Sequence, residues 1–220
     1  MTRALTALVA LLCSALALAL GAAMLALPEF AVRLPDQVAA NLDASGVAHP
    51  VTAVLLNFRG YDTLLEVAVL LLALLGVFAL SQRADARMHP ATPGHPVLQT
   101  LARVLAPLMV LVAGYLLWVG AHAPGGAFQA GAVLAAAGVL LRLAGLLPAG
   151  ASPGVLLRGG LALGLLVFLA VAAAALAQGS LLQYPPALAG PLILLVETGL
   201  TLSIGLILAG LYLASTELRS

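Results

Sequence analysis

The sequence predicts an all-α, polytopic protein that crosses a membrane about six times, with both termini on the cytoplasmic side. Of its 220 residues, 63% are hydrophobic and 8% are charged, and the mean hydropathy is +1.16. Soluble domains carry about 25% charged residues, so this composition lies far outside the soluble class. Six apolar runs, divided by Pro, Gly or charged residues, each approach the length of about 20 residues that a spanning helix needs.

The first apolar run, residues 4–27, predicts a spanning helix that stays in the mature protein. A cleaved signal peptide is the alternative, although its apolar core would be shorter, about 7–15 residues. Residues 28–50 form the only sizeable polar stretch of the sequence. Within it, residues 31–42 predict a short amphipathic helix lying on the membrane surface.

Residues 51–80 are too long for one straight crossing, and Gly60 lies between two parts of this segment. We interpret residues 51–58 as an entering or re-entrant piece and residues 61–80 as the crossing helix itself. This division places a break in the segment close to Gly60.

Residues 81–99 carry three charged residues and three prolines, which predicts a loop between two modules. Four further spans are expected after it, at residues 101–120, 129–147, 156–178 and 191–214. The expected organisation is a two-helix module at 1–85, a linker at 86–100 and a four-helix module at 101–220.

The arginine residues predict the orientation, because cytoplasmic loops carry the excess of positive charge. All nine basic residues are Arg. One side of the predicted topology holds Arg33 and Arg59, and the other side holds the remaining seven: Arg3, Arg83, Arg87, Arg103, Arg142, Arg158 and Arg219. The seven-arginine side is expected in the cytoplasm. The scattered arginines and the net charge of +1 give no sign of a nucleic-acid partner.

Four polar side chains, Asn57, Arg59, Asp62 and Glu66, stand at or inside the mouth of the second span. Helical spacing places Asp62 and Glu66 on one face, one turn apart, with Arg59 a further turn back. Charge at membrane depth costs about 2.5–3.5 kcal/mol per residue, so it points to function. The alternative is a helix-end cluster that anchors the span at the interface.

Glu197 is the other lone carboxylate inside a predicted span, and it is followed by Thr198, Gly199, Thr201 and Ser203. Hydroxyl neighbours and a small residue suit a proton or cation relay, or a hydrogen bond between helices. A neutral Glu with one structural hydrogen bond is an equal alternative.

His122 precedes Pro124, Gly125 and Gly126 in a predicted tight turn between two spans, whose backbone amides are expected to point at the next helix. A histidine can pass protons near neutral pH, although it can equally be incidental to a structural turn. The predicted topology puts His122, Glu66 and Glu197 in the same outer zone of the membrane.

Catalytic, cofactor and metal motifs are missing from the sequence. It has no GxSxG, Walker, HExxH or dinucleotide pattern, and its one cysteine, Cys13, has no partner for a disulfide or thiolate site. We therefore expect no catalytic residue, no metal, no cofactor and no enzymatic activity.

Two motifs resemble segments of one family. His122-Ala-Pro-Gly-Gly-Ala-Phe-Gln-Ala-Gly131, before a Gly/Ala-rich helix, resembles the PGGGF signature of the B subunit (MnhB-like) of Mrp-type multisubunit sodium/proton antiporters. That family usually has a third Gly where this chain has Ala127, and Asp where it has Glu197. Asn57-Phe-Arg-Gly-Tyr-Asp-Thr-Leu-Leu-Glu66 resembles the C-terminal end of the antiporter A subunit and a small subunit of membrane-bound hydrogenases, with Asn57 in place of an acidic residue.

The resemblance implies a small multi-pass subunit in the inner (plasma) membrane of a prokaryote. Its partners would be other hydrophobic antiporter subunits and the lipid bilayer, and its transported ions Na⁺ and H⁺. Glu66 and Glu197 would be pathway carboxylates, with Arg59 and Asp62 at the helix entry. A membrane-arm subunit of an ion-pumping hydrogenase or complex-I-like oxidoreductase, and a purely structural subunit, are the alternatives.

Overall fold

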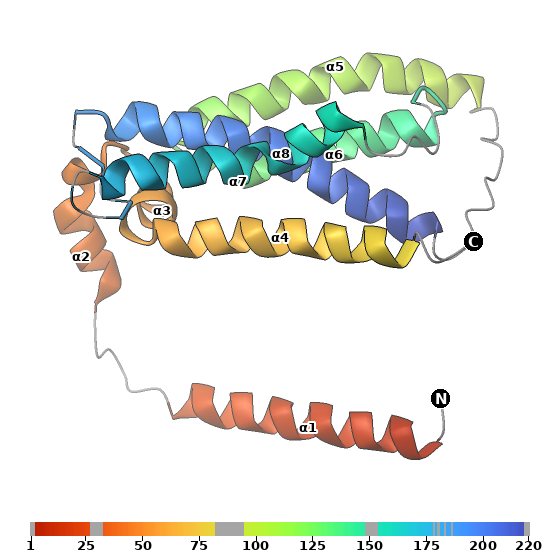
Figure 1. The fold of residues 1–220 in the computed structure, drawn as a ribbon, viewed down its shortest axis with the longest axis horizontal. Helices are drawn as coiled ribbons and strands as arrows, with labels where there is room; N and C mark the ends of the chain where they lie inside the picture. The colour runs from red at the N-terminus through yellow and green to blue at the C-terminus, as the bar shows by residue number, and fades with distance from the viewer. Residues whose placement is uncertain are drawn as a thin grey trace. The chain divides into compact units, whose positions relative to one another are not determined.

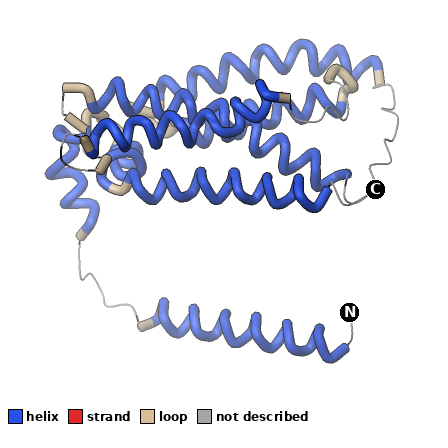
Figure 2. The backbone as a smooth tube through the Cα atoms, in the orientation of Figure 1, coloured by secondary structure: helices blue, strands red, loops and turns tan. Residues whose placement is uncertain are grey.

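The computed structural model describes residues 3–26, 33–81, 95–147, 154–177, 179, 181–182, 184–185 and 187–217. These residues are helical apart from turns and short connections, and no strand occurs among them (Figure 1 and Figure 2). The chain divides into two compact units, Met1–Gln37 and Val38–Ser220, each of which is described by itself. The all-α class predicted from the sequence is therefore confirmed.

Among the described residues, five helices are long and apolar enough to cross a membrane, and a sixth apolar helix is shorter. The five are α1 (Arg3–Leu25), α4 (Gly60–Ser81), α5 (Pro96–Val119), α7 (Val155–Leu176) and α8 (Ala189–Glu217), and the shorter one is α6 (Ala127–Leu143). They correspond to the six predicted spans. The cytoplasmic placement of the termini stays a prediction.

Helix α6 ends four residues before the predicted limit of its span. Gly145 adopts a left-handed conformation with φ of 70°, and the Leu146 amide donates to the Leu141 carbonyl over 2.9 Å. A glycine in this conformation closes a helix by satisfying its last carbonyls. The apolar Leu146 and Leu147 extend the hydrophobic run, but not the helix.

The polar stretch contains a short helix, α2 (Leu34–Asn41), followed by a 3₁₀ turn, η1 (Leu42–Ser45). Helix α2 covers most of the predicted 31–42, of which residues 31–32 lie outside the described residues. Its location on the membrane surface stays a prediction.

The segment before α4 is broken at the predicted place. Helix α3 (Pro50–Ala53) passes into a π-helical turn, η2 (Val54–Phe58), and α4 begins at Gly60. The Arg59 amide donates to the Val54 carbonyl over 2.7 Å, and the Thr63 hydroxyl donates to the Leu55 carbonyl, also over 2.7 Å. These bonds satisfy backbone groups that a continuous helix would have paired internally.

Helix α8 is the centre of the second unit and packs against α4, α5, α6 and α7 (Figure 1). Its large, fully buried apolar side chains recur every three or four residues, as expected for one face of a helix: Ile193, Val196, Leu200, Ile204 and Ile207. Small residues allow its neighbours to come close. A Cβ on Gly131 of α6 would lie 2.8 Å from Ile204, and one on Gly164 of α7 would lie 2.8 Å from Ser203.

Backbone hydrogen bonds join the segment before α3 to the turn between α5 and α6. The amides of Ala48 and His49 both donate to the Ala121 carbonyl, over 2.9 and 3.0 Å, and the Thr52 hydroxyl donates to the Gly120 carbonyl. Gly46, with φ of 78°, lies against the start of α8, where a Cβ would be 2.4 Å from Ala189. Residues from the two halves of the chain therefore form one end of this unit together.

Candidate functional site

Glu197 is the only buried carboxylate among the described residues. Its side chain is 3% exposed, and the other buried polar side chains there are Ser, Thr or Tyr. The Ala127 amide, at the first position of α6, donates to its Oε1 over 3.3 Å. An amide at a helix N-terminus is a good donor to an anion, because the helix leaves it unpaired and adds its dipole. The fold thus places one carboxylate inside the helix bundle with one donor.

The turn between α5 and α6 is shaped to receive this carboxylate. Gly126 has φ of 103°, a conformation that glycine adopts readily, and a Cβ there would lie 2.7 Å from Oε1 of Glu197. The Gly126 amide donates to the Leu116 carbonyl over 2.8 Å. Gly125 is equally confined, because its Cβ would lie 2.5 Å from the same carbonyl oxygen. The amide at the start of the next helix is that of Ala127, which donates to Glu197. Pro124 lies exposed in this turn.

The hydroxyl groups near Glu197 donate to backbone carbonyls, and one of these bonds joins two helices. Thr201 donates to the backbone carbonyl of Glu197 over 2.8 Å, and Thr198 donates to that of Leu194 over 2.7 Å. Ser203 reaches across to α7 and donates to the Leu161 carbonyl over 2.6 Å. Helical Ser and Thr commonly bond to carbonyls one turn back, and that local bond uses up the donors of both threonines.

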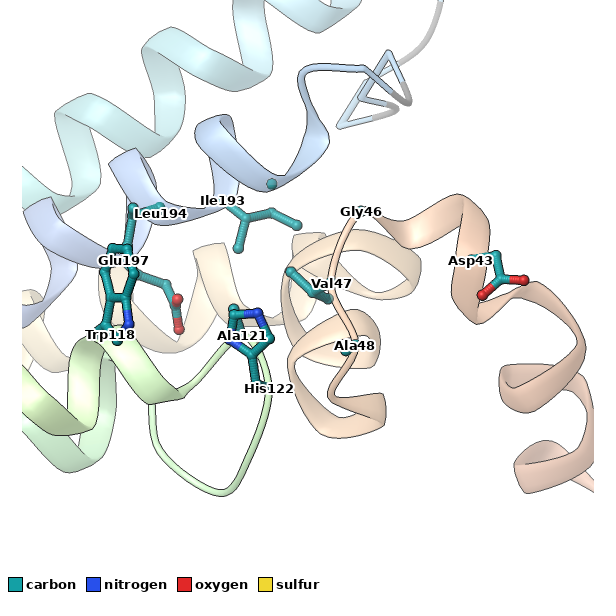
Figure 3. Close-up of a pocket in the computed structure, with 11 residues that line it drawn as sticks. Asp43, Gly46, Val47, Ala48, Trp118, Ala121, His122, Ile193, Leu194 and Glu197 are labelled. Carbon is teal, nitrogen blue, oxygen red and sulfur yellow. The ribbon is translucent and has the colours of Figure 1, made fainter.

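Two cavities lie beside Glu197. The first cavity has a volume of about 420 Å³ and is lined by the loop before α3, the end of α5 and the start of α8 (Figure 3). The second cavity has a volume of about 260 Å³ and lies between α3, η2 and α4 on one side and the start of α6 on the other. Glu197 lines both of them.

The structure brings three of the predicted site residues together. His122 lines the first cavity with Glu197, and Glu66 lines the second cavity with Glu197. Figure 3 shows the His122 ring on its turn and the Glu197 side chain on α8 at the same opening. The glutamate of the α4 mouth and the histidine of the α5–α6 turn therefore each share a cavity with the same buried carboxylate.

Arg59 and Asp62 are not part of either cavity. They form an ion pair one turn apart at the start of α4, as their spacing suggested, and the pair is largely exposed. Asn57 has a structural bond instead, because its side-chain amide donates to the Ser45 carbonyl over 2.9 Å. A carboxylate at that position has no hydrogen to donate, so the asparagine suits this particular contact.

Further polar residues of the cavities were missed in the sequence. Asp43 lines the first cavity, and Thr52, Thr63 and Gln129 line the second. Thr63 gave a usable signal, since it precedes Glu66 by three residues on the same helix face. Asp43 gave none, because it lies in a loop whose position depends on tertiary contacts. No group of three or more metal-ligating side chains occurs in the described part of the chain.

Fold and site together define a class, the multi-pass helical membrane protein with an ionisable side chain inside its bundle. A family model described as a domain related to the MnhB subunit of Na⁺/H⁺ antiporter matches residues 97–216. Because this match covers more than half of the chain, the chain belongs to that MnhB-related family.

A second family model, MbhE, which describes the E subunit of MBH, matches residues 1–94. Two solved structures have the same fold, and each is 26% identical to this chain in sequence. One is a chain of the Mrp complex from Dietzia sp. DQ12-45-1b, with a TM-score of 0.71 over 96% of this chain and 26% of that one. The other belongs to the membrane-bound sulfane sulfur reductase, an archaeal respiratory membrane complex, with a TM-score of 0.74 over 98% of both chains. No curated protein matches the chain.

These matches confirm the resemblance on which the sequence interpretation depended. The chain spans about a quarter of the Mrp-complex chain and nearly the whole of the reductase chain.

Proposed function

We propose that this protein is a small, non-catalytic membrane subunit of a multisubunit cation (Na⁺)/proton antiporter, and that Glu197 and Glu66 belong to its ion or proton pathway. The single observation that carries the proposal is the place of Glu197, buried in the bundle and lining two cavities. The MnhB-related family and the likeness to a chain of an Mrp complex support it.

A carboxylate suits this task because it can hold a proton or a cation and release either one. Burying a carboxylate without a partner costs free energy, so a carboxylate kept at such a place usually has a function. Glu197 has one hydrogen bond, at a length beyond the usual 2.7–3.2 Å range for an amide donor. A single long bond offsets little of the free-energy cost of burying the carboxylate. This favours a functional over a purely structural reason for the residue.

Glu66 supports the presence of partner subunits. It is exposed on α4 in the chain by itself, within a helix long and apolar enough to span a membrane. A carboxylate facing lipid at that depth is unfavourable by about 2.5–3.5 kcal/mol. We infer that another hydrophobic subunit covers Glu66 in the assembled complex, which we place in the inner (plasma) membrane of a prokaryote with lipid around it.

The organisation into two modules belongs to the same proposal. The family matches to residues 1–94 and 97–216 support a two-helix module at 1–85 and a four-helix module at 101–220, joined by a linker at 86–100. With Arg59 and Asp62 at its entry, the first module would bring Glu66 to the Glu197 of the second.

The test is Glu197→Gln in the intact complex, which keeps the shape of the side chain and removes its charge. We expect cation/proton exchange in membrane vesicles to fall at least tenfold, while the other subunits are recovered with the tagged chain in normal amounts. Thr198→Ala, an exposed neighbour on the same helix, is the matched control and should retain exchange. Wild-type exchange by an assembled Glu197→Gln complex would favour the purely structural role.

A second candidate is a membrane-arm subunit of an ion-pumping respiratory or hydrogenase complex. The observation in its favour is the match to the sulfane sulfur reductase chain over 98% of both chains. Purification of the tagged chain in mild detergent distinguishes the two candidates. Antiporter-like membrane subunits without iron–sulfur or nickel proteins support the antiporter, whereas co-purifying soluble redox subunits support the second candidate.

A further inference from the structure

Building on the function proposed above, we propose that the Glu197 side chain is a movable partition between the two cavities, and that its displacement joins them into one passage. Among the described residues, Glu197 is the only one that lines both of these cavities. The first cavity adjoins Asp43 and His122, and the second adjoins Glu66. A passage through Glu197 would connect these groups.

The cavities are large enough to hold water on both sides of the partition. A single water needs about 10–15 Å³ of such volume and two to four polar partners. The volumes of about 420 and 260 Å³ exceed that many times. Polar side chains occur on both sides, with Asp43 and His122 in the first cavity and Thr52, Thr63, Glu66 and Gln129 in the second.

The other parts of the wall are fixed by the backbone. Ala48 and His49 are bonded to the Ala121 carbonyl, and Thr52 is bonded to the Gly120 carbonyl beside it. These bonds hold the first module against the α5–α6 turn at the boundary between the cavities. Moving any of them would displace several hydrogen bonds at once, so the backbone is an unsuitable gate.

The Glu197 side chain, in contrast, is held weakly and has room to turn. One bond of 3.3 Å joins it to the protein, and the open volume of the two cavities that it lines gives the side chain room to turn. Breaking that bond frees a flexible side chain without altering the fold.

The lining of the passage favours cations over anions. Carboxylates at Asp43, Glu66 and Glu197 lie along it, and no arginine lines either cavity. His122 is the one group in these linings that can become positive, and it lines only the first cavity. Carboxylate-lined pores select cations by this electrostatic attraction.

The experiment measures access to engineered cysteines in the intact complex, held in lipid nanodiscs so that both aqueous faces are open. Cys13 is first replaced by Ser, and a reporter is placed in the first cavity (Ala121→Cys) or in the second (Thr63→Cys). The probe is a cationic, membrane-impermeant methanethiosulfonate. With Glu197 present, the first reporter should react quickly and the second slowly.

Removing the partition by Glu197→Ala should accelerate modification of the Thr63→Cys reporter at least tenfold and leave the Ala121→Cys reporter unchanged. Glu197→Asp, a shorter carboxylate, is a second variant in case the alanine protein does not assemble, and it should give a smaller acceleration. Leu194 lines only the first cavity. Leu194→Ala is therefore the control variant and should have no effect on the second reporter.

Fast modification of Thr63→Cys with Glu197 intact, or equal slow rates with and without Glu197, would overturn the partition. Labelling does not measure ion exchange, so its outcome is independent of the test of the proposed function. Loss of exchange in Glu197→Gln without a labelling barrier would leave Glu197 as a relay that separates nothing. A labelling barrier with normal exchange in Glu197→Gln would retain the partition and reject the relay.

Discussion

One hydrogen bond connects residues that are 70 positions apart, the Ala127 amide and the Glu197 carboxylate. These are also the two positions where the chain differs from the usual family pattern of a third glycine and an aspartate. A glutamate is longer than an aspartate by one methylene, and the helix-terminal amide that receives it belongs to the altered residue. The two differences therefore meet in a single contact.

Gly126 should be the least replaceable residue of this contact. Gly126→Ala puts a Cβ 2.7 Å from Oε1 of Glu197 at φ of 103°, a region that costs a side chain about 1–3 kcal/mol. We expect a lower melting temperature of the purified complex and weaker ion exchange. Gly114→Ala is the control, because no atom lies within 4 Å of its Cβ position; an equal loss in both variants would contradict the explanation.

Tyr184, in the connection between α7 and α8, offers a test of a buried hydroxyl group. Its side chain is 5% exposed, and its hydroxyl has no hydrogen-bond partner among the described residues. Burying an unpaired hydroxyl costs about 1–3 kcal/mol, so Tyr184→Phe should leave the protein equally stable or stabilise it. Thermal unfolding at pH 8 checks this, with the exposed Tyr115→Phe as a neutral control. A clear loss of stability would indicate a partner for the hydroxyl.

The pH dependence of the same variant has a definite sign. Burial raises the pKa of Tyr184 from 10.0 to about 12. Above pH 10 the unfolded chain ionises this tyrosine while the folded chain does not, so wild-type stability falls as the pH rises from 10 to 12. The Tyr184→Phe protein lacks this contribution, and its advantage over the wild type should be larger at pH 11 than at pH 8.

At the scale of elements, the close approach of α7 and α8 depends on a small residue, Gly164. A Cβ on Gly164 would meet Ser203 at 2.8 Å and the Cα of Leu200 at 3.0 Å, while Gly159 on the same helix has open space. Gly164→Val should therefore separate the helices and sharply lower the yield of folded protein in detergent. Gly159→Val is the matched control, and comparable yields from the two variants would contradict this account.

The helices themselves could be predicted from the sequence, because an apolar run of spanning length has few alternatives in a membrane. The residues at which the helices end were harder to predict. The end of α6 is set by the left-handed Gly145, whereas hydrophobicity continues through Leu147. The break at η2 was indicated by Gly60, but its π-helical geometry depends on bonds from Arg59 and Thr63 that no periodicity reveals.

The site was predictable only in its parts. Glu66, Glu197 and His122 were conspicuous because each is polar inside or beside an apolar run. Their arrangement was not, since it requires knowledge that α4 and α6 pack against the same helix. The sequence also could not show that the hydroxyls of Thr198 and Thr201 bond to the backbone.

At the scale of the whole molecule, the two proposed modules should hold together without the covalent link. Helix α4 packs against α7 and α8, and backbone bonds join Ala48 and His49 to Ala121. Co-expression of residues 1–90 and 91–220 as separate chains should therefore yield a pair that co-purifies through a tag on either one. Recovery of the tagged fragment alone would show that the linker is needed for association.

The second cavity takes its walls from both halves of the chain, Thr52, Thr63 and Glu66 from one and Gln129 and Glu197 from the other. The residues of the two walls therefore have to remain compatible with each other. A mutation that reshapes one wall changes the environment in which the opposite wall is selected, so the two halves cannot diverge independently here. Exchanging one half for that of a distant relative should preserve the helices and still lose the cavity.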